Sequence, residues 1–432
     1  MAVSSAPSPI PDSVGLTASQ RQRGIIALMV SNLFSWGGFF LLIPLVAVHY
    51  VDDLGWAAGT IGVMLAVRQF SQQGFSPIFG LVCDRIGPKP LICAGQLVRA
   101  AGFGGMAFAE TPLQVLLTMA LAGFGGAMFD APKSAAMACL TTPAERPRRY
   151  ATLGVTSGLG VTLGTQLGAL LITQDFAAVA LASGGVYIFL FVWNVVALPS
   201  MRVSTGSMRA SEGLRMVWWD RDFILFLAIS TGYFFVTAQF SLTITLAAAD
   251  IAGTASAVAW IYLVNTAITV GLGYFVPRWL ERWFRPVDLL IVGTLVISIG
   301  LALVGFSANI AGILVAAAVF SLGAIMARPG QETVIANLAD PGARGTYFGI
   351  GGLALAIGGG FGFLFGGIAY DYGKQHELQL ATWLLFFAIG SVTSVLLWAN
   401  RQRFDQVRDG VSTPSATPPH TELTTVPAHT AG

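Results

Sequence analysis

Long apolar runs separated by short polar interruptions make up most of the chain. A helix needs about 20 apolar residues to cross about 30 Å of hydrocarbon, and each run is near or above that length. We therefore predict twelve transmembrane helices. They lie at about 24–48, 58–82, 88–109, 112–136, 148–173, 177–199, 222–248, 255–276, 287–307, 310–337, 345–369 and 380–400.

The longest polar interruption, residues 200–221, falls between the sixth and seventh runs. It predicts an all-α integral membrane protein with two bundles of six helices, at 24–199 and 222–403, joined by a linker. Residues 1–23 lack the order of a signal peptide, in which basic residues come before a short apolar stretch, so we expect a disordered tail. Residues 404–432 are rich in Pro and Thr, and we expect a second disordered tail there.

The composition supports this class and excludes others. Of the 432 residues, 55% are hydrophobic and 10% are charged, whereas soluble domains carry about 25% charged residues. The net charge of +2 is small and dispersed, which argues against a nucleic-acid partner. Cys83, Cys93 and Cys139 lie near the ends of apolar runs without metal-ligand spacing, and we interpret them as free packing thiols.

The basic residues predict an orientation. Eighteen of the 23 Lys and Arg residues lie in one set of alternate loops and in the two tails, and the other set of loops holds only Lys374. Because basic residues gather on the cytoplasmic side of membrane proteins, we expect both termini in the cytoplasm.

An internal repeat relates the two predicted bundles. Five residues recur with a constant offset of 198: Pro143, Arg146, Gly160, Gly164 and Gly168 correspond to Pro341, Arg344, Gly358, Gly362 and Gly366. Each set is a turn followed by a G-x-x-x-G-x-x-x-G helix, a pattern that allows helices to pack closely in membranes. Two homologous halves, with a substrate site between them near the midplane, are typical of secondary transporters.

No group of residues suggests an enzyme, a metal site or a cofactor. The four His residues lie at span edges or in the tail, and no nucleophile elbow or phosphate-binding loop is present in the sequence. The glycine-rich residues 349–367 lie inside a predicted span, where helix packing explains them better than nucleotide binding.

Polar residues within the spans are candidates for a substrate cavity. Arg68, Gln69 and Gln72 share one face of a helix, and a charge at mid-membrane costs roughly 2.5–3.5 kcal/mol, so this face should line a water-filled cavity or meet a carboxylate. A structural polar seam between helices is the alternative, and aromatic stripes are equally consistent with packing. The other candidates are Asn32, Trp36, Phe39, Arg99, Tyr233, Gln239, Tyr262 and Asn265.

Two acids lie within the predicted spans, Asp130 and Glu332. Lys133 follows Asp130 by one turn, and Arg328 precedes Glu332 by four residues, so both acids are spaced for local ion pairs. Either pair could be a structural latch. Alternatively, an acid that loses its partner during a conformational change could take up a proton.

A charged turn between the second and third runs, Gly80 to Pro90, resembles the loop of the major facilitator superfamily written G-x-L-x-D-R-x-G-R-[KR]. The matching residues are Gly80, Asp84, Arg85, Gly87 and Lys89, while the usually basic ninth position is Pro88. The resemblance implies a cytoplasmic gate. We expect Asp84 to cap the start of the eleventh helix near Tyr347.

Several further stretches resemble the MdtH-like family of bacterial multidrug-efflux proteins, which are drug:proton antiporters. They include residues 51–58 (VDDLGWAA), 129–135 (FDAPKSA) and 355–359 (LAIGG). The resemblance implies proton-coupled export of lipophilic compounds by alternating access in the bacterial inner membrane, with lipid, substrate and protons as partners. A monomer suffices, because the chain contains both halves.

The sequence departs from the drug:proton antiporter pattern at three positions. Thr165 replaces the proline of the helix 5 motif, the arginine expected near Met119 is absent, and Ser31 stands where an acid is expected. An alternative stays open on the same fold, a facilitator or proton symporter of a polar or anionic metabolite in which Arg68 or Arg99 binds the anion, because the aromatic-rich cavity has no compensating acid for a cation. A membrane enzyme or receptor is a second alternative, although it would need catalytic groups that the sequence does not show.

Overall fold

The computed structural model describes residues 16–141, 146–172, 175–201, 210–254, 257–273, 275–280, 282–339 and 344–405. Within these ranges some side chains lie outside the description, namely those of residues 52, 84, 138, 146–148, 150, 151, 210–214, 278, 344 and 345. The regular structure of the described residues is entirely helical.

The first half of the chain forms six long helices and two short ones. They are α1 (Ala18–Val48), η2 (His49–Asp53), α2 (Ala58–Ile86), α3 (Pro88–Gly105), η3 (Met106–Phe108), α4 (Pro112–Leu140), α5 (Arg146–Leu171) and α6 (Phe176–Ala197). In this half α1 packs on α5 and α6, α3 packs on α4 and α6, and α2 packs on α4.

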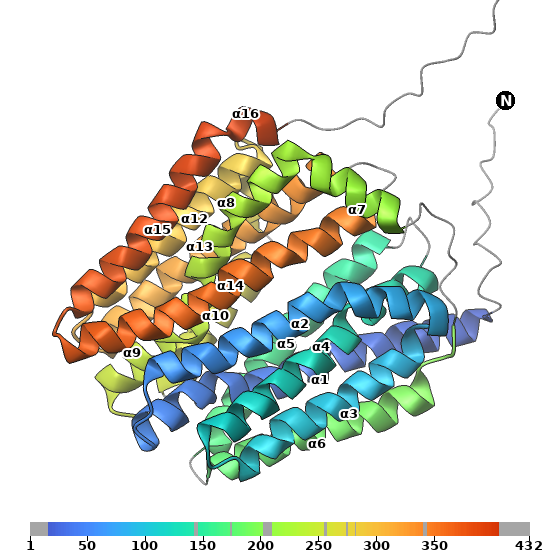
Figure 1. The fold of residues 1–432 in the computed structure, drawn as a ribbon, viewed down its shortest axis with the longest axis horizontal. Coiled ribbons are helices and arrows are strands. Elements are labelled where there is room, and N and C mark those ends of the chain that lie inside the picture. Colours follow the sequence, from blue (N-terminus) through green and yellow to red (C-terminus); the bar gives the residue numbers. More distant parts are fainter. Residues whose placement is uncertain are drawn as a thin grey trace, which may run out of the picture.

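The second half repeats this arrangement with additional short helices. It comprises α7 (Ala210–Trp219), α8 (Arg221–Ala238), η4 (Gln239–Ser241), α9 (Thr243–Ala252), α10 (Ala257–Leu272), α11 (Phe275–Leu280), α12 (Pro286–Gly305), α13 (Ile310–Leu338), α14 (Arg344–Gln375), α15 (Gln379–Ala399) and α16 (Arg401–Phe404). Here α12 packs on α13 and α15, and α14 packs on α8. The two groups of helices lie side by side in Figure 1, with α2 and α14 adjacent along their boundary.

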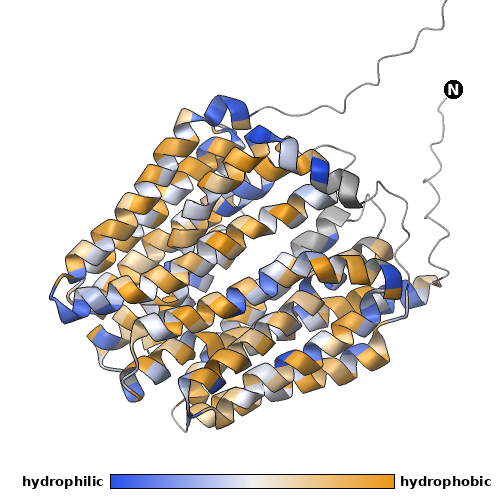
Figure 2. Ribbon diagram, in the orientation of Figure 1, coloured by the Kyte–Doolittle hydropathy of each residue, from blue (hydrophilic) through white to orange (hydrophobic). Residues whose placement is uncertain are grey.

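Nine helical segments among the described residues are long and apolar enough to cross a membrane. The predicted spans 58–82, 148–173 and 255–276 correspond to α2, α5 and α10, which are helical but more polar or shorter. The span predicted at 222–248 is interrupted at η4, where Leu242 leaves helical geometry with φ −120° and ψ −75°. Figure 2 shows hydrophobic residues along most of the helical surface and hydrophilic residues gathered near the helix ends.

Local sequence explains where several helices begin. Thr17 caps α1, because its hydroxyl accepts a hydrogen bond from the Gln20 amide at 3.2 Å while the Gln20 side chain accepts one from the Thr17 amide at 2.9 Å. The helix therefore starts at Ala18, six residues before the predicted span. The same pairing of Thr111 with Gln114 begins α4.

The ends of the helices define two opposite faces of the molecule. We call the face where α1 begins at Ala18 and α16 ends at Phe404 the terminal face. The opposite face, where α1 ends at Val48 and α2 begins at Ala58, is the distal face. Figure 1 shows the start of α1 and α16 on the same side of the molecule, so both described ends of the chain lie at the terminal face.

Candidate functional site

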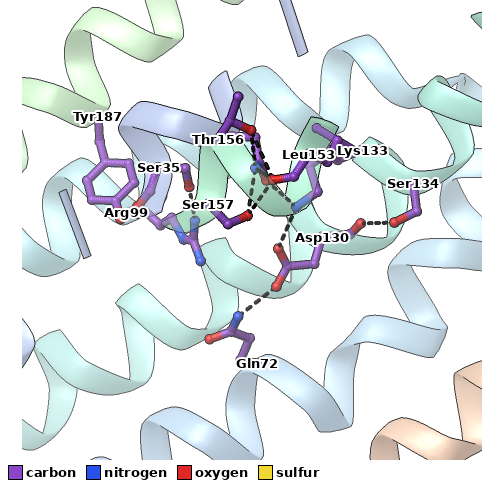
Figure 3. Close-up of polar contacts among 11 residues, drawn as sticks. Ser35, Gln72, Arg99, Asp130, Lys133, Ser134, Leu153, Thr156, Ser157 and Tyr187 are labelled. Atoms are coloured by element: carbon purple, nitrogen blue, oxygen red, sulfur yellow. Dashed lines mark hydrogen bonds and ion pairs between the residues drawn. The ribbon is translucent and has the colours of Figure 1, made fainter. Parts of the chain in front are cut away.

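A buried arginine lies in the middle of the first helix group, where α1, α3 and α6 meet (Figure 3). Arg99 of α3 donates a hydrogen bond from Nη1 to the Ser35 hydroxyl at 2.6 Å, and the Tyr187 hydroxyl donates to the Ser35 carbonyl at 2.9 Å. The guanidinium also lies 5.5 Å from the Phe129 ring and 5.4 Å from the Tyr187 ring. Its Nε is buried without a hydrogen-bond partner. Arg99 thus forms no ion pair with a described residue.

A second group of charges joins α2 to α4. Arg68 donates to Gln69 at 2.8 Å and to Gln72 at 2.7 Å, and Gln72 in turn donates to the Asp130 carboxylate at 2.6 Å. The Lys133 ammonium lies 3.8 Å from that carboxylate. The predicted pair of Asp130 and Lys133 is therefore present, and Gln72 connects it to Arg68.

Asn32 extends this network to α5. Its side-chain amide donates to the Leu153 carbonyl at 2.9 Å and to the hydroxyls of Thr156 at 3.0 Å and Ser157 at 2.8 Å. Its carbonyl oxygen accepts a hydrogen bond from the Lys133 ammonium at 3.0 Å. Every polar group of the Asn32 side chain is thus occupied, which makes it a positioning residue for Lys133.

The network carries more positive than negative charge. Arg68, Arg99 and Lys133 lie close enough to interact electrostatically, with Asp130 as the acid among them. In the sequences of α1 to α6 the one other acid is Asp84, in the last turn of α2. Each charge held at mid-membrane costs roughly 2.5–3.5 kcal/mol, so such an excess is an expensive feature.

An aromatic cluster adjoins the network and crosses between the two helix groups. Trp36 lies 6.2 Å from Phe39 and 5.8 Å from Phe40, measured between ring centroids. Arg68 lies over Phe39 at 4.9 Å, and Phe40 contacts Tyr262 of α10 at 5.6 Å. The cluster therefore places an apolar wall beside the cations.

The two helix groups meet closely at the distal face. A Cβ on Gly62 or Gly367 would collide with backbone oxygens of Phe363 or Ala58, so α2 and α14 approach each other at backbone distance. Farther from that face, the Phe70 and Phe361 rings lie 5.9 Å apart.

One carboxylate reinforces this contact. Asp371 of α14 accepts hydrogen bonds from the first two amides of α2, Ala58 at 2.8 Å and Gly59 at 2.6 Å. These amides have no partner within their own helix, and the positive end of the α2 dipole favours the carboxylate. Asp371 was not among the residues predicted from the sequence, although an acid just beyond the end of a predicted span was a usable signal.

The helix groups separate toward the terminal face. In Figure 1 the ribbons of α2 and α14 diverge in this direction. Their contact extends at least to Gly352, whose Cβ would lie 3.6 Å from the Gln73 side chain, whereas a Cβ on Gly349, closer to the terminal face, would have no neighbouring atom within 4 Å. The predicted pair of Arg328 and Glu332 is present on α13 at 3.3 Å, with side chains 74% and 58% exposed. An exposed ion pair in an apolar helix needs water or polar head groups beside it, and Glu332 lies six residues before the terminal end of α13.

The helix arrangement agrees with one known family. Residues 28–363 match the profile of the Major Facilitator Superfamily. The chain belongs to this superfamily. Its relatives include the "Multidrug resistance protein MdtH" of Yersinia enterocolitica, 38% identical over 391 residues that cover 90% of this chain and 98% of that protein. The protein of the same name from Proteus mirabilis is 37% identical over 405 residues, covering 94% and 100%.

Solved structures of other facilitators share the fold. A crystal structure of the nucleoside transporter NupG matches with a TM-score of 0.72 and 12% identity, covering 87% of this chain and 98% of that one. A POT family transporter matches with a TM-score of 0.76 and 10% identity, covering 89% and 97%. The predicted facilitator fold is thus confirmed, and the chain is a multi-pass membrane transporter.

The predicted turn at residues 80–90 is mostly helical: Gly80, Asp84 and Arg85 of the facilitator loop motif lie in the last turns of α2, and Lys89 lies in the first turn of α3. Gly87 has a φ of 84°, which a residue with a side chain would adopt only under strain, and it joins the two helices. Lys89 donates to the Val195 carbonyl of α6 at 2.9 Å, whereas Arg85 is exposed. The side chain of Asp84 lies outside the described residues, so its predicted cap stays a prediction.

Tyr347, the expected neighbour of Asp84, contacts the acid Asp220 of the second helix group. Its buried hydroxyl donates to the Asp220 carboxylate at 2.8 Å, and Asp220 also caps α8 by accepting from the Phe223 amide at 3.1 Å. The start of α14 is therefore tied to α8 within the second helix group.

Four cavity candidates lie in the second half of this facilitator, and all are at least half-buried. Tyr233 lies within electrostatic range of the Arg328–Glu332 pair, and the Tyr262 hydroxyl donates to Ser241 at 3.4 Å. The Asn265 amide donates to Ser321 at 2.9 Å.

The fourth candidate, Gln239, is fully buried. Its amide donates to the Gly362 carbonyl at 2.9 Å, so it joins η4 to α14 rather than facing open space.

The six repeat glycines lie at equivalent close helix contacts. Gly160, Gly164 and Gly168 of α5 face α1, where a Cβ would collide with the carbonyl oxygens of Leu33, Gly37 and Leu41. Gly358, Gly362 and Gly366 of α14 face α8 and η4, where a Cβ would meet Thr231, Phe235 and Gln239. The α5–α1 contact is thus repeated by α14 against α8.

Proposed function

We propose that this facilitator is a secondary active transporter that exports amphipathic or lipophilic small molecules in exchange for protons. The names of its relatives support multidrug efflux as the activity. The half-buried aromatic cluster of Trp36, Phe39 and Phe40 supports an amphipathic substrate, because it offers an apolar surface next to charged groups.

One observation supports alternating access above the others: the helix groups are closed at the distal face and separate toward the terminal face. The distribution of basic residues favours a cytoplasmic location for the terminal face, in the inner membrane of a bacterium. In this assignment the cavity opens to the cytoplasm, the side from which an exporter loads its substrate. A monomer contains both helix groups and needs no partner chain.

For proton coupling we propose Asp130 rather than Glu332. The Asp130 side chain is 37% exposed, and through Gln72 and Lys133 it belongs to a network that joins α1, α2, α4 and α5. A change in the protonation of Asp130 would therefore alter the hydrogen bonds that join these four helices. Glu332 contacts Arg328 on its own helix, and an exposed pair of this kind contributes at most about 1 kcal/mol.

The test is transport by the purified protein in proteoliposomes under an imposed pH gradient. Cationic and anionic amphipathic dyes would be followed for the wild type, Asp130→Asn and Glu332→Gln. We expect the gradient to drive dye movement in the wild type and in Glu332→Gln, while Asp130→Asn binds dye without driven transport. Driven transport in Asp130→Asn would contradict the assignment, and a wild type that ignores the gradient would contradict proton coupling.

For the opposite state we propose that Asp84 acts as the cytoplasmic gate. In a conformation closed at the terminal face, its carboxylate would meet the positive end of α14 near Tyr347. Asp84→Asn should then loosen that state and abolish transport. Unchanged turnover and unchanged accessibility of a cysteine placed near the terminal end of α2 would contradict this role.

The excess of positive charge around Arg99 favours a second candidate function on the same fold, a facilitator or proton symporter of an anionic metabolite. The proteoliposome assay separates the two. A symporter would accumulate solute on the side that protons enter, whereas an antiporter would accumulate solute on the side that protons leave.

A further inference from the structure

Arg99 is a buried cation, and most of its hydrogen-bond donors have no acceptor among the described residues. One guanidinium nitrogen donates to Ser35, the Nε is buried without a partner, and Nη2 makes no hydrogen bond to a described residue (Figure 3). The Nε of Arg68 is likewise buried without a partner. A guanidinium has five donors in a planar fork that matches the two oxygens of a carboxylate.

Asp130 does not neutralise Arg99. Its carboxylate oxygens contact Gln72 and Lys133, and the path from Gln72 leads to Arg68. The Arg99 guanidinium lies over the Phe129 and Tyr187 rings, which stabilise its charge but do not neutralise it. Arg68 and Arg99 are therefore the two cations of the network that contact no carboxylate of a described residue, and Arg99 has fewer hydrogen bonds than Arg68.

The internal repeat provides evidence that packing does not require an arginine at this position. The offset of 198 pairs Arg99 with Ile297, and the surrounding helix contact is the same in both halves. A Cβ on Gly125 would lie 2.8 Å from the Arg99 backbone nitrogen, and a Cβ on Gly323 would lie 2.6 Å from that of Ile297. The second half thus makes this contact with an aliphatic side chain.

We propose that Arg99, assisted by Arg68 and Lys133, binds the carboxylate of the transported molecule. The substrate class is an amphipathic organic anion whose aromatic body lies against the cluster of Trp36 and Phe39. This inference rests on the proposed transport of amphipathic molecules and specifies the charge that the site selects. It predicts that acids are preferred over neutral or cationic molecules of the same shape.

The test is equilibrium binding to the detergent-solubilised full-length protein, which needs no transport. Tritiated 2-naphthylacetate, its methyl ester and 2-naphthylethylamine share one aromatic body and differ in charge. We expect the wild type to bind the acid roughly tenfold or more tightly than the ester or the amine, the scale of a charge-assisted bidentate contact.

Arg99→Ile copies the side chain that the second half carries, so it should fold. We expect it to lose that roughly tenfold preference while its affinity for the ester is unchanged, and Arg99→Lys should retain part of the preference. The matched control is Arg401→Gln, which removes an exposed cation at the terminal face. Arg68→Gln serves as a second variant if Arg99→Ile does not elute as a folded protein.

Equal binding of acid and ester by the wild type would overturn the carboxylate site. Equal loss of both ligands in Arg99→Ile and Arg68→Gln would also overturn it, because that pattern indicates a structural role. The binding assay tests the carboxylate site alone, and the proteoliposome assay tests the proposed transport. A protein that prefers the acid but transports nothing in proteoliposomes retains the site and loses the proton-coupled exporter.

Discussion

The contact between Asp371 and the start of α2 should hold the distal face closed. Two amides donate to this half-buried carboxylate, at 2.8 and 2.6 Å, and the helix dipole adds to the attraction. Hydrogen bonds to charged groups contribute about 1.5–3 kcal/mol each, and the dipole contributes about 0.3–1 kcal/mol. Asp371→Asn keeps one acceptor oxygen but loses the charge, so we expect the closed state to lose about 2 kcal/mol.

This loss corresponds to a roughly 30-fold increase in the population that is open at the distal face. The assay is the rate at which a membrane-impermeant maleimide, added from the distal side, modifies Ala66→Cys. Ala66 is buried and follows Gly62 by one turn on the α2 face toward α14, so modification requires the helices to separate. The background lacks the three native cysteines, Cys83, Cys93 and Cys139.

Asp53→Asn is the matched control for this experiment. Asp53 lies at the same face and loses the same charge, but its carboxylate contacts His49 on the same short helix at 2.9 Å. We expect its modification rate to equal that of the parent. The reasoning is refuted if Asp371→Asn leaves the rate unchanged, or if Asp53→Asn raises it equally.

Two further predictions concern the helix contacts. Gly164→Ala places a Cβ against the Gly37 carbonyl and should cost about 1–3 kcal/mol, seen as a lower melting temperature in detergent, whereas Gly158→Ala on the same helix meets open space and should not destabilise the protein. Tyr347→Phe leaves the buried Asp220 carboxylate without one donor and should also lower the melting temperature, by about 1–3 kcal/mol of stability. An unchanged melting temperature in either variant would contradict the packing or hydrogen-bonding role assigned to it.

The sequence was sufficient to predict the helices and the polar faces, because both depend on periodicity within a single segment. Arg68 and Gln72 share a helix face as predicted, and each uses that face to contact the network. The two local ion pairs were predictable for the same reason, since their members lie three and four residues apart.

Contacts between distant segments were not predictable in this way. Asp371 reaches amides more than 300 residues earlier in the chain, and no local capping side chain marks the start of α2. Gln239 was predicted to line a cavity, yet its amide donates to the carbonyl of Gly362. A polar residue in a span needs a partner, but the sequence alone does not show whether that partner is a substrate, water or a nearby backbone group.

The internal repeat extends beyond the glycines of α5 and α14, and the positions at which the two halves differ carry information about function. The contact of α3 with α4 recurs between α12 and α13, with Gly95 and Gly102 corresponding to Gly293 and Gly300 at the same offset of 198. Close packing is therefore built twice from one pattern. The charges are not repeated, because the position of Arg99 between its two glycines is occupied by an isoleucine in the second half. Since both halves fold with the same helix contact, that contact does not require the arginine, and this is the ground on which we propose a binding role for Arg99.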